Sequence, residues 1–151
     1  MLLLWCTCSG GSEMATAPRF WRENPSRYNL VGFKCNSCGR SYFPRRSICP
    51  VCHRRSVGKI EEIKLKGTGK VFSVTEVHDG LEDLTMQKPY LVAIVELDEG
   101  PKVTGQVIDC DPSAVDIGTP VRATLRKLSE EGPSGIIHYG YKFVPIREKA
   151  P

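Results

Sequence analysis

Apolar and polar residues alternate with a period of two along several short stretches of the chain, a pattern typical of half-buried β-strands. In PVRATLRKL (120–128) the alternation predicts an inward face made of Val121, Ala123 and Leu125. In IIHYGYKFVPI (136–146) the residues that share one face are Ile137, Tyr139, Tyr141 and Phe143. YLVAIVELD (90–98) is almost continuously apolar, which favours a central strand.

Two further stretches predict strands. KIEEIKLKGTGKVFSVTEVH (59–78) predicts a strand that enters and leaves a glycine bend, after which Phe72 and Val74 share a face opposite to Val71. KVTGQVID (102–109) carries Gly105 where a bulge or a close approach would sit. Polar loops are predicted at 80–89 and 129–135, and a turn or one helical loop at 109–120.

Five short strands, glycine-marked bends and almost no helical periodicity predict a mainly β protein with a small closed barrel. The insertion between the third and fourth barrel strands favours a five-stranded OB-fold, and an SH3-like barrel is the alternative. The 151 residues are expected to form an extension (1–13), a short N-terminal helical segment (14–32), a cysteine-rich module (33–62), the barrel (63–147) and a tail (148–151).

The first thirteen residues, MLLLWCTCSGGSE, lack the basic start of a secretory signal, and their apolar run is too short for one. Met14 follows and opens a cytosolic type of beginning, MATAPRFW, so we expect Met14 to be the biological start. No apolar run approaches the ~20 residues of a membrane span. We therefore expect a cytoplasmic protein with no membrane partner.

Residues 17–30 predict one or two short helical turns, which the Asn-Pro step at 24–25 should break or kink. The segment carries the aromatic residues Phe20, Trp21 and Tyr28. So short a segment cannot bury three aromatic rings by itself. They are expected either to fold back on the domain or to dock on a partner.

Two CxxC pairs lie in CNSCGRSYFPRRSICPVC (35–52), separated by ten residues. Each pair brings two sulfurs to one ion from a tight turn, and Gly39 can supply the positive φ that such a turn often needs. The four candidate ligands, Cys35, Cys38, Cys49 and Cys52, complete a tetrahedral sulfur shell that suits one structural Zn²⁺. The pattern thus predicts a rubredoxin-like zinc ribbon.

Iron is the alternative metal, because rubredoxin-like sites also pair two CxxC turns and can take up iron on overexpression. A disulfide framework would need a secretory context, and a thioredoxin-like redox pair would need a βαβ unit. A closed four-thiolate shell has no open coordination position, so it fastens a structure rather than activating a substrate. The sequence has no Walker-type phosphate loop, no nucleophile-elbow serine and no HExxH.

The charge is unevenly distributed along the chain. Residues 34–70 contain ten Lys/Arg and two acids, hence +8, whereas residues 71–151 contain eight Lys/Arg and thirteen acids, hence −5. The basic part either meets an anionic partner or is a solvated face that keeps a small metal module soluble. The arginines that flank the second CxxC, and whose forks suit phosphate, are Arg45, Arg46, Arg54 and Arg55.

The order of these motifs resembles that of one known family. A helical piece with FW precedes Y-x-L-x-G-x-K-C-x-x-C-G (28–39), which is followed by F-P-R-R-x-x-C-P-x-C (43–52). A G-x-G-x-V strand (67–71) and a terminal YGYKFVP (139–145) complete the order. The chain resembles the acyl-CoA-associated zinc-ribbon/OB-fold family, once known only as a domain of unknown function.

The resemblance implies a non-catalytic subunit that accompanies thiolase-fold enzymes. The chain is most similar to the archaeal subunit that bridges acetoacetyl-CoA thiolase and HMG-CoA synthase at the entry to the mevalonate pathway. There the small protein ties the enzymes together and helps to shape a shared coenzyme A site, so that acetoacetyl-CoA passes directly to the synthase. Bacterial relatives serve other thiolase-like enzymes, including sterol side-chain lyases and acyltransferases.

In that role Phe20, Trp21 and Tyr28 would be interface anchors, and the four arginines would meet coenzyme A phosphates or an acidic enzyme face. The competing function is nucleic-acid binding, which OB barrels and zinc ribbons both perform. That function needs aromatic and basic residues interleaved along a barrel groove, whereas here the aromatics gather at the N-terminus and in the last strand. Rubredoxin-like electron transfer is a further alternative.

Overall fold

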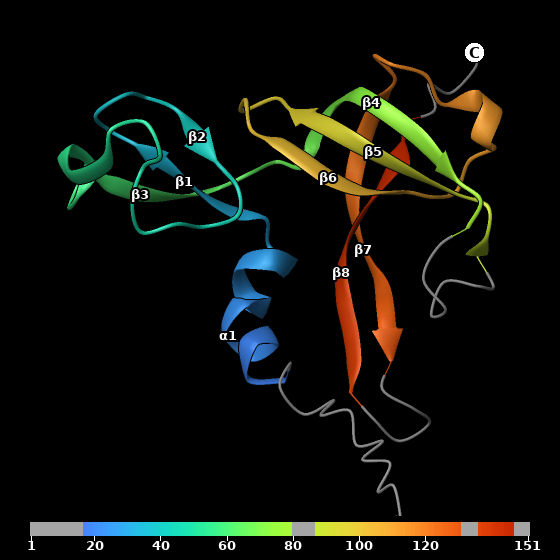
Figure 1. Cartoon of the computed structure of the whole chain (residues 1–151), viewed down its shortest axis with the longest axis horizontal. Helices are drawn as coiled ribbons and strands as arrows, with labels where there is room; N and C mark the ends of the chain where they lie inside the picture. The colour runs from blue at the N-terminus through green and yellow to red at the C-terminus, as the bar shows by residue number, and fades with distance from the viewer. Residues whose placement is uncertain (1–16, 80–86, 131–135, 147–151) are drawn as a thin grey trace, which may run out of the picture.

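The structure, a computed structural model, describes residues 17–79, 87–130 and 136–146 (Figure 1). It consists of a helix, a small three-stranded sheet and a five-stranded closed barrel. The helix is α1 (Ala17–Tyr28), and the strands of the small sheet are β1 (Val31–Cys35), β2 (Ser41–Tyr42) and β3 (Ile60–Lys64). The barrel strands are β4 (Thr68–Val77), β5 (Tyr90–Leu97), β6 (Lys102–Val107), β7 (Pro120–Glu130) and β8 (Ile137–Pro145).

The barrel strands close in the order β4-β5-β6-β8-β7. All neighbours are antiparallel except β6 and β8, which are parallel and pair only at Val107 and Phe143. A 3-10 turn, Pro112–Ala114, lies in the insertion between β6 and β7. The prediction of a mainly β protein with an OB-fold barrel is confirmed.

Four fully buried side chains form the centre of the barrel: Val71, Val95, Val121 and Phe143. Val71 is followed by a β-bulge between Val71 and Ser73, which inserts one extra residue into β4. Phe72 is therefore 48% exposed, while Val71 and Val74 both pack toward the core. The predicted shared face of Phe72 and Val74 is wrong, because a strict period of two does not reveal a bulge.

The β7–β8 hairpin extends beyond the rest of the barrel (Figure 1). β4 pairs with β7 only at residues 120–122, so among the described strands β8 alone lies beside β7 beyond this point. Val121 is buried and Ala123 packs against the core, but Leu125 is 46% exposed. The predicted inward position of Leu125 is wrong, since the alternation continues after the barrel wall that would cover it has ended.

The small sheet and the barrel meet through an apolar joint. Leu30, before β1, and Leu65, after β3, are buried in the barrel's own core cluster, and the Leu65 amide donates to the Leu30 carbonyl at 3.0 Å. Phe43, which follows β2, packs edge-on against Tyr141 of β8 with ring centroids 5.5 Å apart. Tyr141 contacts Phe143 in the same way at 6.0 Å. This row of rings links the small sheet to the barrel core.

The helix α1 runs from Ala17 to Tyr28 without the predicted break at residues 24–25. Pro25 lies inside it, and its carbonyl accepts hydrogen bonds from both the amide and the side-chain amide of Asn29, at 3.4 and 2.9 Å. A proline removes one backbone donor, and the contacts of α1 with β1 and β8 hold the turn together despite that loss. The helix ends at Tyr28, and Leu30, two residues later, has a φ of +50°.

Several expectations lie outside the described residues. They are the extension with its Met14 start, the tail, and most of the polar loops at 80–89 and 129–135.

Gly69 allows β4 to approach β5 closely. A Cβ at this position would collide with the Glu96 carbonyl oxygen and lie 2.9 Å from the Leu97 Cα. Because backbone atoms of paired strands cannot move aside, Gly69→Ala should lower the free energy of unfolding by about 2 kcal/mol in urea titrations. The neighbouring exposed Lys70 supplies the control: Lys70→Ala should change it by less than about 0.5 kcal/mol. Equal stability of the two variants would contradict the close approach.

Candidate metal centre and arginine groove

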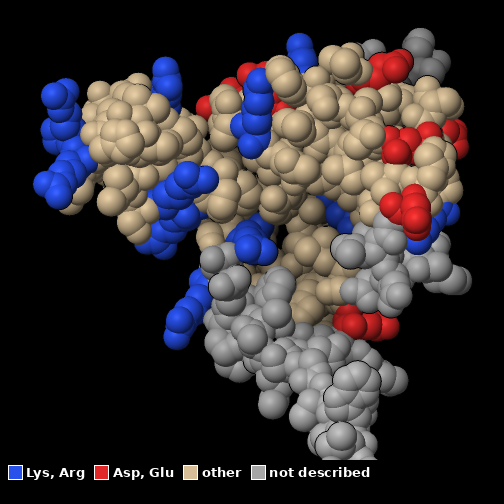
Figure 2. All heavy atoms as spheres, in the orientation of Figure 1, with Lys and Arg blue, Asp and Glu red and all other residues tan. Residues whose placement is uncertain are grey.

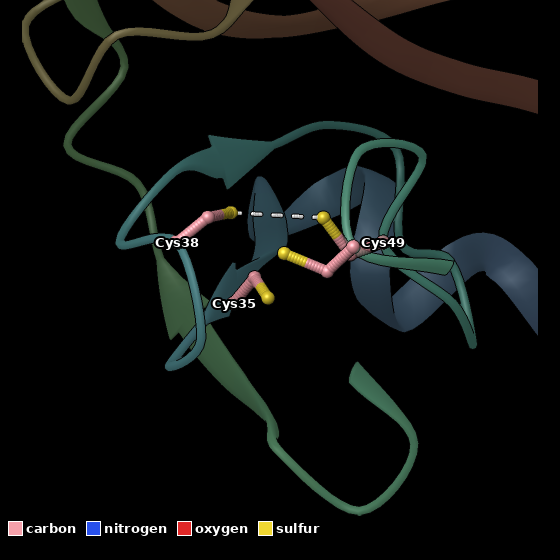
Figure 3. Close-up of side chains that lie close together, drawn as sticks. Cys35, Cys38 and Cys49 are labelled. Atoms are coloured by element: carbon pink, nitrogen blue, oxygen red, sulfur yellow. Dashed lines mark hydrogen bonds between the residues drawn. The ribbon is translucent and has the colours of Figure 1, made fainter. Parts of the chain in front are cut away.

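Four cysteine sulfurs converge at one end of the small sheet. Cys35 ends β1 and Cys38 lies in the following turn, while Cys49 and Cys52 come from the loop between β2 and β3. All four Sγ atoms lie within 4.8 Å of one another, and those of Cys38 and Cys49 are 3.7 Å apart. Figure 3 shows the sulfurs of Cys38 and Cys49 facing each other across the dashed line, with Cys35 beside them.

The two CxxC turns have the same backbone hydrogen bond. The Gly39 amide donates to the Cys35 carbonyl at 2.7 Å, and the His53 amide donates to the Cys49 carbonyl at 2.9 Å. The residue after each pair has a positive φ, +72° at Gly39 and +46° at His53. The expectation for Gly39 is confirmed, and in the second turn histidine, one of the residue types that tolerates this region, takes the place of glycine.

Sequence reasoning missed two residues that support the cluster. Ser56 is fully buried, accepts a hydrogen bond from the Cys49 amide at 3.0 Å and donates to the His53 carbonyl at 2.6 Å. The Tyr42 hydroxyl lies 3.8 Å from Cys49 Sγ. The available signal for Ser56 was a small hydroxyl residue that ends the basic run HRRS, while nothing in the cysteine spacing indicated Tyr42.

Burial and hydrogen bonding act in opposite directions on these thiols. Burial raises the pKa of the Cys49 thiol, but hydrogen bonds from the Cys52 and Val51 amides, with smaller contributions from Tyr42 and Cys38, lower that pKa to about 6. Burial raises the pKa of the Cys52 thiol to about 12, and its contacts with Cys38 and Cys35 add to the rise. Bringing all four groups to the thiolate form therefore needs a cation that compensates their charge.

The donor set fits a single four-coordinate metal ion. Zn–S bonds of about 2.3 Å in a tetrahedron require sulfurs about 3.8 Å apart, and the Cys38–Cys49 distance of 3.7 Å agrees with this. Four sulfur ligands would leave no position for a substrate or water. A metal held here would cross-link β1 to the loop that carries Cys49 and Cys52. No second group of three or more candidate ligands occurs in the described part of the chain.

The structure separates the four predicted arginines into two pairs. Arg45 and Arg46 line a hollow of about 280 Å³ between the loop after β2 and α1. Two arginines of α1 that the sequence did not single out, Arg22 and Arg27, line the same hollow. We call these four residues the arginine groove; Arg45 also pairs with Glu62 at 2.7 Å.

Arg54 and Arg55 lie apart from the arginine groove, exposed in the 3-10 turn His53–Ser56. Of the predicted docking aromatics, Tyr28 is 36% exposed at the end of α1. Phe20 and Trp21 are in the helix, but their side chains lie outside the described residues.

An exposed aliphatic group, also missed by sequence reasoning, surrounds the second CxxC turn. Ile48, Val51 and Val57 are each at least half exposed. Ile48 precedes Cys49 and Val57 follows Ser56, and the Cys49 amide donates to the Ser56 hydroxyl. We call these three residues the aliphatic tip. Figure 2 shows Lys and Arg side chains over this end of the molecule and Asp and Glu side chains over the far side of the barrel.

Comparison with known families identifies both parts of the chain. The family described as "ChsH2, rubredoxin-like zinc ribbon domain" matches residues 22–58, and "ChsH2, C-terminal OB-fold domain" matches residues 62–126. The chain is 49% identical over 128 residues to a DUF35 domain-containing scaffold protein of Methanocaldococcus jannaschii, a match that covers 85% of this chain and 89% of that protein. The chain belongs to the DUF35 family.

Some of the other similar proteins are named as enzyme subunits. The DUF35 chain is 26% identical over 117 residues to the benzoylsuccinyl-CoA thiolase subunit BbsA of Thauera aromatica, covering 78% of this chain and 76% of that subunit. It is 31% identical over 102 residues to a probable enoyl-CoA hydratase alpha subunit of Thermomonospora curvata, which covers 68% of this chain and 31% of that protein.

Among solved structures, one named "Ltp2-ChsH2(DUF35) aldolase" matches with a TM-score of 0.62 and 27% identity, over 86% of this chain and 93% of that chain. The predicted resemblance to a zinc-ribbon/OB-fold family is thus confirmed. Within the described residues, no helix is long and apolar enough to cross a membrane.

Ser56 offers a test of how the cluster is held together. Ser56→Ala would leave the buried Cys49 amide without its acceptor, so metal affinity should fall by about tenfold, as it does when outer-shell partners of other metal sites are removed. The measurement is competition with a chromophoric zinc chelator. Ser47→Ala, at an exposed serine in the same loop, should leave the affinity unchanged. Unaltered affinity in Ser56→Ala would remove Ser56 from the metal site.

Proposed function

We propose that this DUF35 chain is a non-catalytic accessory subunit that docks on thiolase-fold enzymes acting on acyl-CoA. The observation that carries the proposal is the metal-ligand cluster, which fastens an exposed aliphatic tip beside arginine side chains. Exposed aliphatic groups rimmed by charge are typical of protein–protein contacts. A shell of four sulfurs has no free position for chemistry, so its use here is structural, with Zn²⁺ as the ion that suits it.

The names of the relatives support the same class of partner. They include a scaffold protein, a thiolase subunit and a complex with an aldolase. The more specific form of the proposal is that the chain bridges acetoacetyl-CoA thiolase and HMG-CoA synthase in the mevalonate pathway, within the cytoplasm. Handing acetoacetyl-CoA directly to the synthase would pull the uphill condensation forward.

The arginine groove supplies the anion-binding part of the proposal. Arg22, Arg27, Arg45 and Arg46 come from two elements and surround one hollow, and guanidinium forks suit phosphate oxygens. We propose that the groove meets the phosphates of coenzyme A at a site shared with the enzyme. An acidic face of the enzyme is the other anion that this groove could take.

The partner is tested by purifying the tagged chain from the cells that encode it and identifying co-eluting proteins by mass spectrometry. Recovery of a thiolase with HMG-CoA synthase, and about one zinc per chain, supports the bridging role. Recovery of a different thiolase-like enzyme keeps the function and changes the pathway. Recovery of nucleic-acid-binding assemblies that dissociate on nuclease treatment would contradict the proposal.

The aliphatic tip should be part of the enzyme contact. Val57→Asp places a charge at a side chain that is 64% exposed, so the fold should tolerate it, while affinity for the recovered enzyme should fall at least about tenfold, as for an interface hot spot. Ile117→Asp is the matched control, since Ile117 is 73% exposed on the barrel side. Surface plasmon resonance compares the two, and equal binding would place the contact elsewhere.

The two arginine pairs separate the coenzyme A hypothesis from a general charge effect. The double variant Arg45→Ala/Arg46→Ala should weaken coenzyme A binding by the enzyme complex about tenfold, because it removes charge-assisted hydrogen bonds. Arg54→Ala/Arg55→Ala removes the same charge outside the groove and should leave that binding unchanged in calorimetric titrations. Equal effects of both pairs would mean that the groove holds no phosphate.

A further inference from the structure

A buried lysine lies on barrel strand β8, beside a hollow that shares only Arg27 with the arginine groove. Lys142 of β8 is only 5% exposed, which is rare for a lysine unless a carboxylate pairs with it. Its Nζ donates to the side-chain oxygen of Gln87 at 3.4 Å, and the same oxygen accepts from Gln106 at 3.2 Å. Among the described residues, no carboxylate forms an ion pair with Lys142.

The charged surroundings of Lys142 make this arrangement costly. Burial lowers the pKa of the Lys142 ammonium, and the nearby Arg126 guanidinium lowers it further. Arg126 itself pairs with Asp109 at 3.3 Å. An ammonium has three donors, and one long, shared contact with an amide oxygen compensates few of them. Burying such a charge without a counter-ion is unfavourable.

The lysine borders a hollow of about 230 Å³ at the seam between β6 and β8. These strands pair only at Val107 and Phe143 and diverge before that point, which opens the wall of the barrel. The lining includes two cationic side chains, Lys142 and Arg27, two polar ones, Thr104 and Gln106, and the larger Leu128 and Tyr139. Within the part of the chain that the structure describes, no acidic residue lines the hollow.

We propose that this seam hollow is a binding site for a small organic carboxylate, whose anionic group pairs with the Lys142 ammonium and whose hydrocarbon body packs against Leu128, which lies over Gly140 on the same face of β8. The carboxylate supplies the counter-ion that the described residues do not. The apolar wall favours an organic acid over inorganic phosphate, which has no hydrocarbon part to bury. The proposal does not rest on the docking function, although Arg27 lines both this hollow and the arginine groove.

The test uses the full metal-loaded chain, with butyrate and inorganic phosphate as probes. Butyrate at millimolar concentration should shift the Leu128 methyl signals in NMR spectra and raise the pKa of Lys142, followed through its ¹³Cε signal, because a bound carboxylate stabilises the ammonium. Phosphate should do neither. This measurement on the unaltered protein needs no variant. Absence of both butyrate effects would overturn the proposal, and an effect of phosphate alone would overturn its carboxylate part.

Two lysine variants locate the site. Lys142→Met keeps the length of the side chain but removes its charge, and it should weaken butyrate binding at least about tenfold, as expected for a charge-assisted hydrogen bond. Lys102→Met removes an exposed lysine of β6 and should bind butyrate as the unaltered chain does. Equal butyrate affinity of Lys142→Met and the unaltered chain, or an equal loss in both variants, would contradict the assignment to Lys142.

Discussion

The convergence of Cys35, Cys38, Cys49 and Cys52 on one point is the constraint on which the ribbon end of the molecule depends. From residue 31 to residue 58 the fully buried side chains are Phe33, Cys35, Cys49 and Ser56, so two of the four are themselves candidate ligands. A core of this size cannot hold a fold by apolar burial. In such small modules the free energy of metal binding is the free energy of folding, and the segments that carry Ile48, Val51 and Val57 adjoin Cys49, Cys52 and Ser56.

The barrel, in contrast, has a core of its own and acts as the base on which the ribbon is mounted. Leu30 and Leu65 belong to that core although they flank ribbon strands, and Phe43 continues the row of rings that ends at Phe143. The same joint positions α1 beside the loop after β2, which is how arginines from two distant parts of the sequence come to share one hollow. The metal cluster, the apolar joint and the arginine groove are thus all parts of one arrangement, in which the small sheet and α1 pack against the barrel.

Features that depend on residue spacing and period could be predicted from the sequence. Features that depend on tertiary packing could not. The cysteine pairs and the OB-fold followed from short-range patterns. Phe72 points outward because of a β-bulge, and Leu125 is exposed because the neighbouring strand β4 ends before it. Neither the bulge nor the end of β4 can be recognised in the local alternation of apolar and polar residues. Arg22 and Arg27 join Arg45 and Arg46 only through the packing of α1, and the burial of Lys142 depends on side chains from three separate segments. Ser56 stands in an otherwise basic run, and its role appears only when the turn closes on Cys49.

If the metal cluster holds the surface by which the chain binds an enzyme, removing the metal must release that enzyme. The most direct measurement removes the metal from the purified complex with a strong chelator and follows both partners by size-exclusion chromatography, with NMR of Val95 and Val121 methyl groups reporting on the barrel. The enzyme should then separate from the chain while the barrel signals persist, and added zinc should restore the complex. An enzyme that stays bound to a metal-free chain would contradict it.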